Sequence, residues 1–483
     1  MQLEPSAPPI SPDEKLAPED NRAFSPWRRT RENTAARRLS EAVAQRITDH
    51  ERRTRQRRPK DAAIFSALVD TVVANLLLVQ LSTDATPDEE NRGRLYISLS
   101  GQRLKSASQT RYDRTHIPLG TLRTRLEKNR EARPGVLDCM ADLDLIYLDK
   151  APRHPDAARP STIKCSDGML ELIAEHDPRL DELQMLFRAV SFDGEIIERE
   201  LIELRDAKQA GHARGQPIEY RDADETRECR KSLQMINEAL DRSDITFDLG
   251  NGVINGRRVP NVGAAIYERT LRRVHHNGRW EHGGRLYGAF WITMQKELRD
   301  GIRIDGHRVV SLDFSSMYLQ LLYVTYAKKP VPDGDLYEGI DPVDGWPEAD
   351  PERKKAMRDT IKANVNAMLF PKPGREGKPY GRLLDGSRSV LSKSVTGPTL
   401  EKRLKEKHPA IAKWIGAKDV GFELMHHESE IMIKTVLRCL EQDIVVLPLH
   451  DGLLVAAPHK EIARQAMLEA FAKHTDGFVA RVS

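Results

Sequence analysis

Two apolar stretches that each contain one acid constrain this chain more than any other feature. In residues 309–323, a strand-like apolar run ends on Asp313 and leads directly into a second apolar segment. In residues 444–455, Asp451 stands between two apolar runs. A buried strand that ends on a carboxylate delivers that group to the mouth of a cleft before a helix or turn begins. We therefore expect two carboxylates to converge on one site if the two strands lie side by side.

Length and cysteine content limit the class of protein. A chain of 483 residues is long enough for about three domains, each with its own core. The four cysteines show no CxxC spacing, which favours reduced thiols of an intracellular protein over disulfides or a zinc site. We find no apolar run of the roughly 18 residues that span a bilayer, and no signal-peptide core. We therefore expect a cytoplasmic protein without a membrane segment.

The N-terminal region is strongly basic although the net charge of the chain is only +3. Residues 1–25 are rich in proline and acidic residues, which is typical of disorder. Residues 21–60 hold thirteen Lys or Arg against four Asp or Glu. Such a run favours phosphate binding or a solvated helical face, and both readings stay open. We predict a disordered, basic tail over residues 1–60.

Residues 61–175 are predicted to form a small domain of helices followed by a β-hairpin with a basic loop. The expected elements are helices at 62–81, 119–131 and 136–143 and strands at 95–99, 145–148 and 161–165. This order resembles a winged helix-turn-helix, a class that either places a helix in the DNA major groove or docks against protein. Both roles stay open.

Residues 176–270 are predicted to be mostly helical, with long charged helices at 180–203 and 224–240. The pair Asp193 and Glu195 has the spacing with which proofreading exonucleases begin their metal site. The flanking residues look helical, and the distance to Asp313 is too short for an added exonuclease domain. We therefore expect no proofreading activity.

The segment 272–291 interleaves glycines, arginines and aromatic residues just before the first acidic strand. Such a composition suits a surface where guanidinium groups meet phosphates and rings stack on bases. Arg279, Arg285 and the nearby Arg299 are the candidate nucleic-acid contacts. Few Asp or Glu residues lie near the histidines of this loop in the sequence, which favours a hydrogen-bonding role over metal binding.

A third informative stretch, residues 358–370, lies between the two acidic strands. Helical spacing places Arg358, Lys362, Asn366 and Phe370 on one face. Two cations, an amide and an aromatic ring on one side suit a nucleoside triphosphate, because cations hold phosphates while the other side chains meet sugar and base.

Together these stretches resemble the three motifs of palm-domain polymerases. Asp313 and its strand resemble motif A, residues 358–370 resemble the R-x3-K motif B helix, and His450 with Asp451 resembles the His-Asp of motif C. The pattern is similar to family A DNA polymerases and the related single-subunit RNA polymerases. The chain is shorter than cellular family A enzymes, which favours a phage, plasmid or mobile-element member.

The resemblance implies an α+β right-hand fold. Its palm, with a small antiparallel sheet, and its fingers occupy residues 271–483, after a helical thumb at 176–270. Helices at 422–441 and 460–473 and a closing strand at 478–482 complete the expected palm.

The resemblance also implies a metal site. Two divalent ions, Mg²⁺ or Mn²⁺, are expected at Asp313 and Asp451, with the Phe314 carbonyl as a third ligand.

The remaining motif residues are implied to bind substrate. Lys362 is expected to bind the triphosphate and to protonate the leaving pyrophosphate, with Arg358 assisting at the phosphates. Phe370 supports the insertion site, and His450 is counted among the substrate-binding groups.

Three positions depart from the family A pattern. Gly452 stands where motif C has Glu, and Tyr318 stands where motif A has the Glu that screens the sugar 2′ position. The sequence around Tyr318 also resembles family B, in which a Tyr screens the sugar, so we expect deoxynucleotides as substrates. Asn366 replaces the usual Phe and matches family B.

The function expected from these features is a template-directed DNA polymerase that uses a DNA template, a primer and deoxynucleoside triphosphates. An accessory replication protein is a possible partner of the N-terminal domain. One alternative is a primase or RNA polymerase that starts chains de novo. A second is a non-catalytic replication initiator or regulator with a vestigial palm. The type of template and the way synthesis starts stay open.

Overall fold

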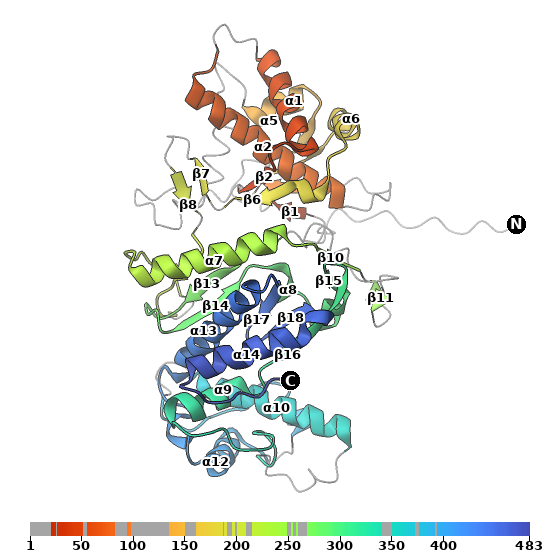
Figure 1. Cartoon of the computed structure of the whole chain (residues 1–483). Helices are drawn as coiled ribbons and strands as arrows, with labels where there is room; N and C mark the ends of the chain where they lie inside the picture. Colours follow the sequence, from red (N-terminus) through yellow and green to blue (C-terminus); the bar gives the residue numbers. More distant parts are fainter. Residues whose placement is uncertain are drawn as a thin grey trace, which may run out of the picture. The chain divides into compact units, whose positions relative to one another are not determined.

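The structure is a computed structural model. It describes residues 21–25, 27–51, 56–82, 94–97, 135–149, 161–186, 188–190, 196–198, 200–208, 215–248, 253–254, 257–258, 268–340, 350–371, 376–391 and 394–483. The chain divides into two compact units (Figure 1). The first comprises residues 1–199 with 255–265, and the second comprises residues 200–254 with 266–483.

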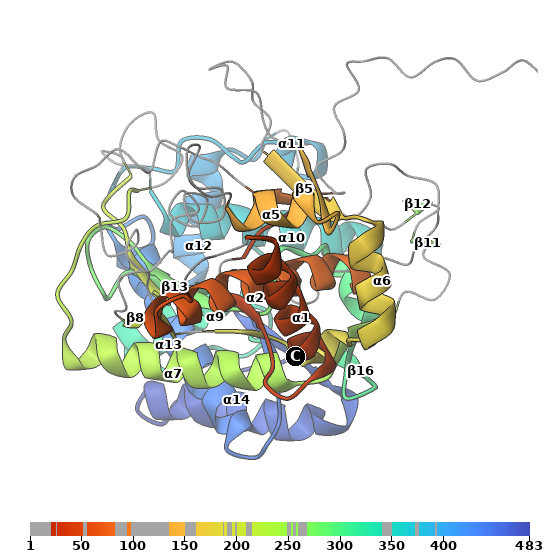
Figure 2. The ribbon, with the colours of Figure 1, turned by 90° about the horizontal axis from the view of Figure 1, so that it is seen from above.

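The first unit is built on two packed helices, α1 (Ala35–His50) and α2 (Pro59–Ser82), seen together in Figure 2. Leu39, Val43 and Ile47 recur every four residues on α1 and are fully buried. The prediction of a disordered tail over residues 1–60 is therefore wrong for α1. That prediction was based on the high arginine content of the segment and did not take the spacing of its apolar residues into account.

Helix α2 is long and apolar enough to cross a membrane by length and composition, with a mean hydropathy of 2.1 over Asp61–Leu81. The prediction that no stretch reaches this length was wrong, because it did not allow for isolated polar residues such as Asp70 and Asn75. These polar groups are buried, and Asp70 accepts a hydrogen bond from Thr30 at 2.5 Å. Because 72% of the apolar window is buried inside the unit, α2 is a core helix here.

Short strands complete the first unit. A four-stranded sheet has the order β1 (Asn21–Ala23), β3 (Arg94–Ile97), β5 (Ser161–Cys165) and β4 (Ile146–Asp149). Helix α5 (Val136–Asp142) precedes the antiparallel β4–β5 pair, and α6 (Asp167–His176) follows it. The helix predicted at 119–131 lies outside the described residues, so the winged-helix assignment stays a prediction.

The predicted helix at 180–203 is not present. That segment holds the 3-10 turn η2 (Leu180–Glu182) and the strands β6 (Leu183–Met185), β7 (Arg188–Val190), β8 (Ile196–Glu198) and β9 (Ile202–Leu204). Strand β6 pairs with β2 (Arg28–Thr30), and β7 pairs with β8. Pairing with a strand far away in the sequence overrides local helix propensity here. Asp193 and Glu195 lie outside the described residues.

The second unit contains an antiparallel sheet whose strand order is β10 (Ile245–Phe247), β15 (Ile302–Ile304), β16 (His307–Asp313), β18 (Gly452–Ala456) and β17 (Val446–Leu449). Helices α13 (Val420–Leu440) and α14 (Lys460–His474) pack against each other and against this sheet (Figure 1). This mixture of helices on an antiparallel sheet agrees with the α+β class expected from the sequence.

A smaller sheet, ordered β14 (Gly283–Tyr287), β13 (Arg272–His275) and β9, packs on α13 and on α7 (Asp224–Arg242). Asn237 of α7 exchanges two hydrogen bonds with the backbone of Leu271, at 2.9 and 2.7 Å. The elements α8 (Phe290–Thr293) and η4 (Lys296–Gly301) lead from β14 toward β15. Helix α7 is the one predicted at 224–240, and its assignment to a thumb stays a prediction.

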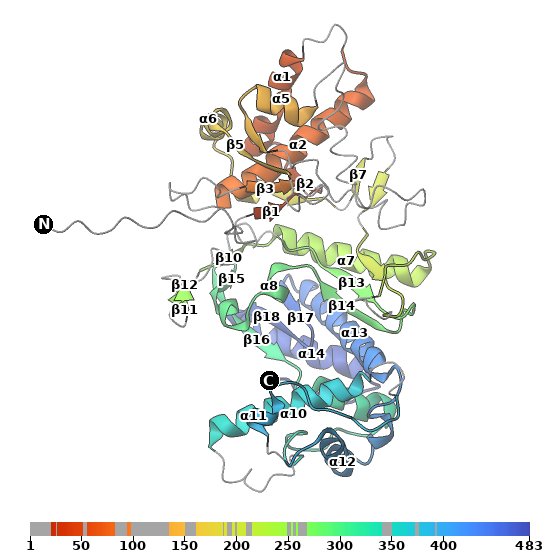
Figure 3. The same cartoon turned by 180° about the vertical axis from the view of Figure 1, so that it is seen from behind.

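The remaining helices of the second unit gather at one end of the large sheet (Figure 3). They are α9 (Met317–Leu321), the π-helical turn η5 (Leu322–Tyr326), α10 (Pro351–Leu369), α11 (Ser387–Val390) and α12 (Gly397–Lys407). Asp350 caps α10 by accepting a hydrogen bond from the N–H of Arg353 at 2.9 Å. The closing strand predicted at 478–482 is not formed; instead, an isolated bridge from Val482 to Phe314 holds this segment beside the end of β16.

Candidate functional site

The two acids that organise the sequence lie next to each other because β16 pairs with β18. Asp313 is the last residue of β16 and stands opposite Gly452, which directly follows Asp451. Asp451 and His450 form the two-residue turn between β17 and β18. The N–H of Phe314 donates a hydrogen bond to the carbonyl oxygen of Asp451 at 2.9 Å. The backbone therefore fixes the separation between the two acids.

Gly452 allows this close approach of the two strands. A Cβ atom at this position would lie 2.0 Å from Oδ1 of Asp313 and 2.5 Å from the carbonyl oxygen of Leu312. No side chain fits at such distances without displacing Asp313. The departure from the His-Asp-Glu motif thus has a steric cause.

The electrostatics of Asp313 reflect its acidic neighbour. Burial raises the pKa of Asp313, and the negative charge of Asp451 raises it further, while Ser311, Lys296 and Lys362 act in the opposite direction. Within the described part of the chain, neither acid forms an ion pair. Two such carboxylates offer hard oxygen ligands of the kind that Mg²⁺ prefers, and a cation between them would relieve their repulsion.

Among the described residues, no group of three or more His, Cys, Asp or Glu is placed to hold a metal ion. A cation at the two acids would therefore need further ligands from backbone carbonyls, water or substrate.

Helix α10 carries three of the four residues that the sequence placed on one face, and the fourth, Phe370, directly follows its last residue. Lys362 is half-buried, and its charge reaches Asp313. It makes no hydrogen bond or ion pair with any described residue. Asn366 is half-buried, and so is Phe370, whose ring lies 5.9 Å from the ring of Tyr318. Lys362 is thus the cation of α10 that stands beside the acids without a protein partner in the described chain.

Arg358 has a different environment from Lys362. Its guanidinium forms an ion pair with Asp335, including a contact of 3.4 Å from Nη2 to Oδ1, and lies 5.4 Å from the ring of Tyr337. Lys407 donates a hydrogen bond to the backbone carbonyl of Asp335 at 3.1 Å. Burial opposes the effect, but the hydrogen bond from Arg358 holds the pKa of Asp335 below its ordinary value. In this structure Arg358 ties α10 to the loop before it.

Arg285, predicted to contact nucleic acid, lies against two side chains of the site. Its Nε and Nη2 atoms donate to the two carboxylate oxygens of Glu428, each at 2.7 Å, and Nη2 also lies 2.5 Å from the hydroxyl of Tyr318. Glu428 is only 1% exposed. Burial raises the pKa of Glu428 and the guanidinium opposes that shift; the two-pronged contact fits the ionised carboxylate.

The role of Glu428 was not predicted from the sequence. A signal was present, because Glu428 lies four residues after Leu424 and three before Ile431, which are both fully buried. An acid at a core-facing position of an amphipathic helix needs a buried partner. The sequence did not show that this partner is Arg285.

Aromatic side chains connect α9, α10 and α13. The ring of Phe370 lies 5.9 Å from Tyr318 and 5.5 Å from Phe422, the latter edge-on. Gly421 makes this contact possible, since a Cβ there would lie 2.4 Å from the carbonyl oxygen of Leu369. The end of α10 is thereby held against the start of α13.

The other candidate nucleic-acid contacts occupy different surroundings. Arg279 is 59% exposed and lies 3.7 Å from Asp419. Arg299 donates to the carbonyl oxygen of Trp291 at 3.2 Å. Burial and the nearby charge of Arg285 lower the pKa of His450 to about 4, so the imidazole beside Asp451 is neutral at pH 7. Arg279 is the most exposed group of this set.

Asn364 of α10 organises the segment that follows the helix, and the sequence did not single it out. It is fully buried and donates to the Ser387 hydroxyl at 2.9 Å. Its Oδ1 accepts from the N–H of Leu384 at 2.9 Å and from the Tyr380 hydroxyl at 3.3 Å. One amide therefore fastens residues 380–387 to α10.

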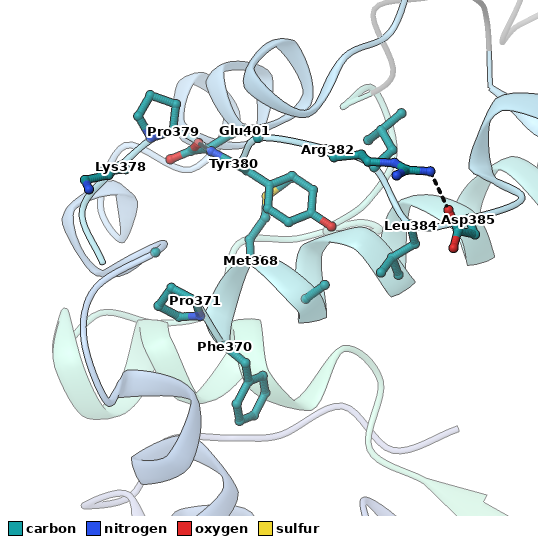
Figure 4. Close-up of a pocket in the computed structure, with 14 residues that line it drawn as sticks. Met368, Phe370, Pro371, Lys378, Pro379, Tyr380, Arg382, Leu384, Asp385 and Glu401 are labelled. Atoms are coloured by element: carbon teal, nitrogen blue, oxygen red, sulfur yellow. Dashed lines mark hydrogen bonds and ion pairs between the residues drawn. The ribbon is translucent and has the colours of Figure 1, made fainter. Parts of the chain in front are cut away.

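A pocket of about 750 Å³ lies between the end of α10 and this segment. Figure 4 shows Tyr380 beside Met368, with the Phe370 ring turned away from them and Arg382 paired with Asp385. Phe370 and Pro371, at the end of α10, also line the pocket.

Comparison with known proteins gives no family for this chain. No family model matches it, and no curated protein matches it. Among solved structures it is similar to the POL domain of Pol1 from M. smegmatis in complex with DNA primer-template and dNTP, at 13% identity and a TM-score of 0.25. The match covers 53% of this chain and 51% of that one. A TM-score of 0.25 does not establish that the two chains share a fold.

Proposed function

We propose that this chain catalyses template-directed nucleotidyl transfer and extends a DNA primer with deoxynucleotides. The observation that carries the proposal is the pairing of β16 with β18, which brings Asp313 and Asp451 together within reach of the charge of Lys362. Acids on adjacent strand ends with a facing cation suit phosphoryl transfer, where charge must be stabilised on both the attacking and the leaving oxygen.

In this proposal Asp313 and Asp451, with the carbonyl of Phe314, hold two Mg²⁺ or Mn²⁺ ions. When bound, such ions lower the pKa of the primer 3′-hydroxyl and neutralise the triphosphate. The fit rests on the donor set: two half-buried carboxylates repel each other and lack an ion-pair partner in the described chain.

The chain's own residues would bind and orient the nucleotide. Lys362 binds the triphosphate and donates a proton to the departing pyrophosphate, and Arg358 assists once it leaves Asp335. Asn366 and Phe370 meet the sugar and the base. Neutral His450 donates or accepts a hydrogen bond on the substrate side of Asp451.

Tyr318 would select the sugar. It follows Asp313 by five residues on α9, is 7% exposed, and is packed beside Phe370. A buried ring there leaves little room for a ribose 2′-hydroxyl, which favours deoxynucleotides. We propose no proofreading activity, and we assign to the first unit a contact with DNA or with an accessory replication protein.

A primer-extension assay with varied template and nucleotide tests the proposal. Wild-type protein with Mg²⁺ should extend a DNA primer on a DNA template with the complementary dNTP, and Asp313→Ala or Asp451→Ala should abolish extension while DNA binding persists. Extension that survives either substitution would contradict the metal assignment.

The same assay separates the two alternatives. Synthesis on unprimed single strands from NTPs would indicate a primase or RNA polymerase. Sequence-specific duplex binding without incorporation in Mg²⁺ or Mn²⁺ would indicate a non-catalytic initiator or regulator.

A further inference from the structure

Three side chains from three elements form a hydrogen-bonded group beside the acid pair. Arg285 comes from β14, Tyr318 from α9 and Glu428 from α13. Arg285 hydrogen-bonds to both partners, as described above, and so joins the Tyr318 hydroxyl to the Glu428 carboxylate. Arg285 is therefore the link between Tyr318 and Glu428.

This group is buried and close to the site. Glu428 is 1% exposed, Tyr318 is 7% exposed, and the Arg285 side chain is 18% exposed. The charge of Asp451 reaches both Glu428 and Tyr318. On its other side, Tyr318 meets the ring of Phe370.

The contacts hold the Tyr318 ring by its polar end. Packing against Phe370 alone would leave the Tyr318 ring able to tilt, because apolar contacts are non-directional. A hydroxyl bonded to a guanidinium that a buried carboxylate holds in place cannot move without breaking a hydrogen bond to a charged group. A ring that cannot move is a stronger barrier to a 2′-hydroxyl than a ring that can.

We propose that Glu428 is a specificity-determining positioning residue: through Arg285 it fixes Tyr318 and so sets the discrimination between deoxyribose and ribose. This inference rests on the proposed function. Glu428 touches neither substrate nor metal in it and acts only through its two neighbours.

The same helix supplies a matched control. Glu430, two residues further along α13, pairs with the buried Arg273 of β13 at 2.9 Å. It has the same chemistry and the same kind of strand partner, but none of the described hydrogen bonds of that partner, Arg273, involves Tyr318.

The test measures kcat and KM for a dNTP and the matching NTP on one primer-template. Glu428→Gln keeps the side-chain shape and removes the charge, so the dNTP preference should fall about tenfold, the size of one lost hydrogen bond to a charged group. The fall should come mainly from a lower KM for the NTP. Glu430→Gln should leave the preference unchanged and thereby account for any general loosening of α13.

A double variant tests whether Glu428 acts through Tyr318. Tyr318→Ala should lower the preference more than Glu428→Gln does, and the combined variant should match Tyr318→Ala, because coupled residues are not additive. Additive effects would overturn the inference, as would an unchanged preference in active Glu428→Gln protein.

Two further outcomes are decisive. If Glu428→Gln does not fold, as judged by circular dichroism, Tyr318→Phe removes only the hydroxyl; a lowered preference supports the inference and an unchanged one overturns it. If wild-type protein incorporates neither sugar, the proposed function fails together with this inference, whereas an active enzyme with unchanged variants overturns the inference alone.

Discussion

At the scale of single residues, the site depends on a close contact between an acid and a glycine. The sequence predicted Asp313 and Asp451 because each stands at the end of an apolar run. It could not explain Gly452, since the reason is a distance of 2.0 Å between a hypothetical Cβ and Oδ1 of Asp313 on another strand. Contacts between residues far apart in the sequence need the strand register, which the local pattern does not give.

Replacing Asp313 should separate stability from activity. Because its folded pKa is raised above the ordinary 3.8, its contribution to stability is present at low pH and is lost as the pH rises through the raised value. Ionised Asp313 therefore costs stability at pH 7. We expect Asp313→Asn to raise the free energy of unfolding by on the order of 1 kcal/mol, measured by urea denaturation at pH 7 without divalent cations, and to abolish primer extension.

The pH dependence supplies the control for this prediction. The stability difference between Asp313→Asn and wild type should shrink near pH 3, where wild-type Asp313 is protonated. A variant less stable than wild type at pH 7 would contradict the repulsion inferred for the acid pair.

Gly452→Ala should displace Asp313. Crowding against Oδ1 of Asp313 and the Leu312 carbonyl should cost about 1–3 kcal/mol of stability. Since a shift of about 1 Å in a catalytic group can cost about 100-fold, kcat should fall by about that factor. Gly377→Ala is the control: its φ of +69° makes an alanine strained, but no atom lies within 4 Å of the added Cβ, so it should cost stability without lowering kcat. Full activity in Gly452→Ala would show that Asp313 tolerates the shift.

At the scale of elements, the helical periodicity predicted which residues share a face of α10, but not which residues they contact. Periodicity identified α10 and the face that carries Lys362, and the structure places Lys362 within charge reach of Asp313. The pattern did not indicate that Arg358 pairs with Asp335, because that residue lies in an irregular loop. It also failed for residues 180–203, where strand pairing decides.

The two cations of α10 should respond differently to removal. Lys362→Ala should raise the KM for nucleotide about tenfold or more, because a charge-assisted contact to phosphate is lost, with little change in melting temperature. Arg358→Ala should raise KM less and lower stability by up to about 1 kcal/mol, the range for a partly exposed ion pair. Steady-state kinetics and thermal unfolding measure both effects.

Asp335→Asn is the matched control for Arg358. It should reproduce the stability loss of Arg358→Ala, because both remove the same ion pair. A different outcome would show that Arg358 binds phosphate once Asp335 no longer holds it. In that case Arg358→Ala would raise KM as much as Lys362→Ala does, and Asp335→Asn would lower KM.

At the scale of the whole molecule, the sequence predicted the second unit better than the first. In the second unit, the predicted strand ends and the helices α13 and α14 occur near their predicted bounds, whereas α10 begins earlier, at Pro351, and the predicted closing strand at 478–482 is reduced to one bridge. In the first unit, the many arginines of α1 led to a prediction of disorder, although the helix buries Leu39, Val43 and Ile47. The number of charged residues in a segment does not show whether it has a buried face, whereas the spacing of its apolar residues does.

The most direct test of the central claim is single-turnover primer extension with Mg²⁺, comparing wild type with Asp451→Asn at equal occupancy of a primed DNA template. The paired acids predict that wild type adds only the nucleotide complementary to the template. They also predict that Asp451→Asn binds the DNA equally well but loses extension by about three orders of magnitude or more, as expected when a metal ligand of the reaction is removed. Extension by Asp451→Asn at the wild-type rate, or none by wild type in Mg²⁺ or Mn²⁺, would contradict the claim.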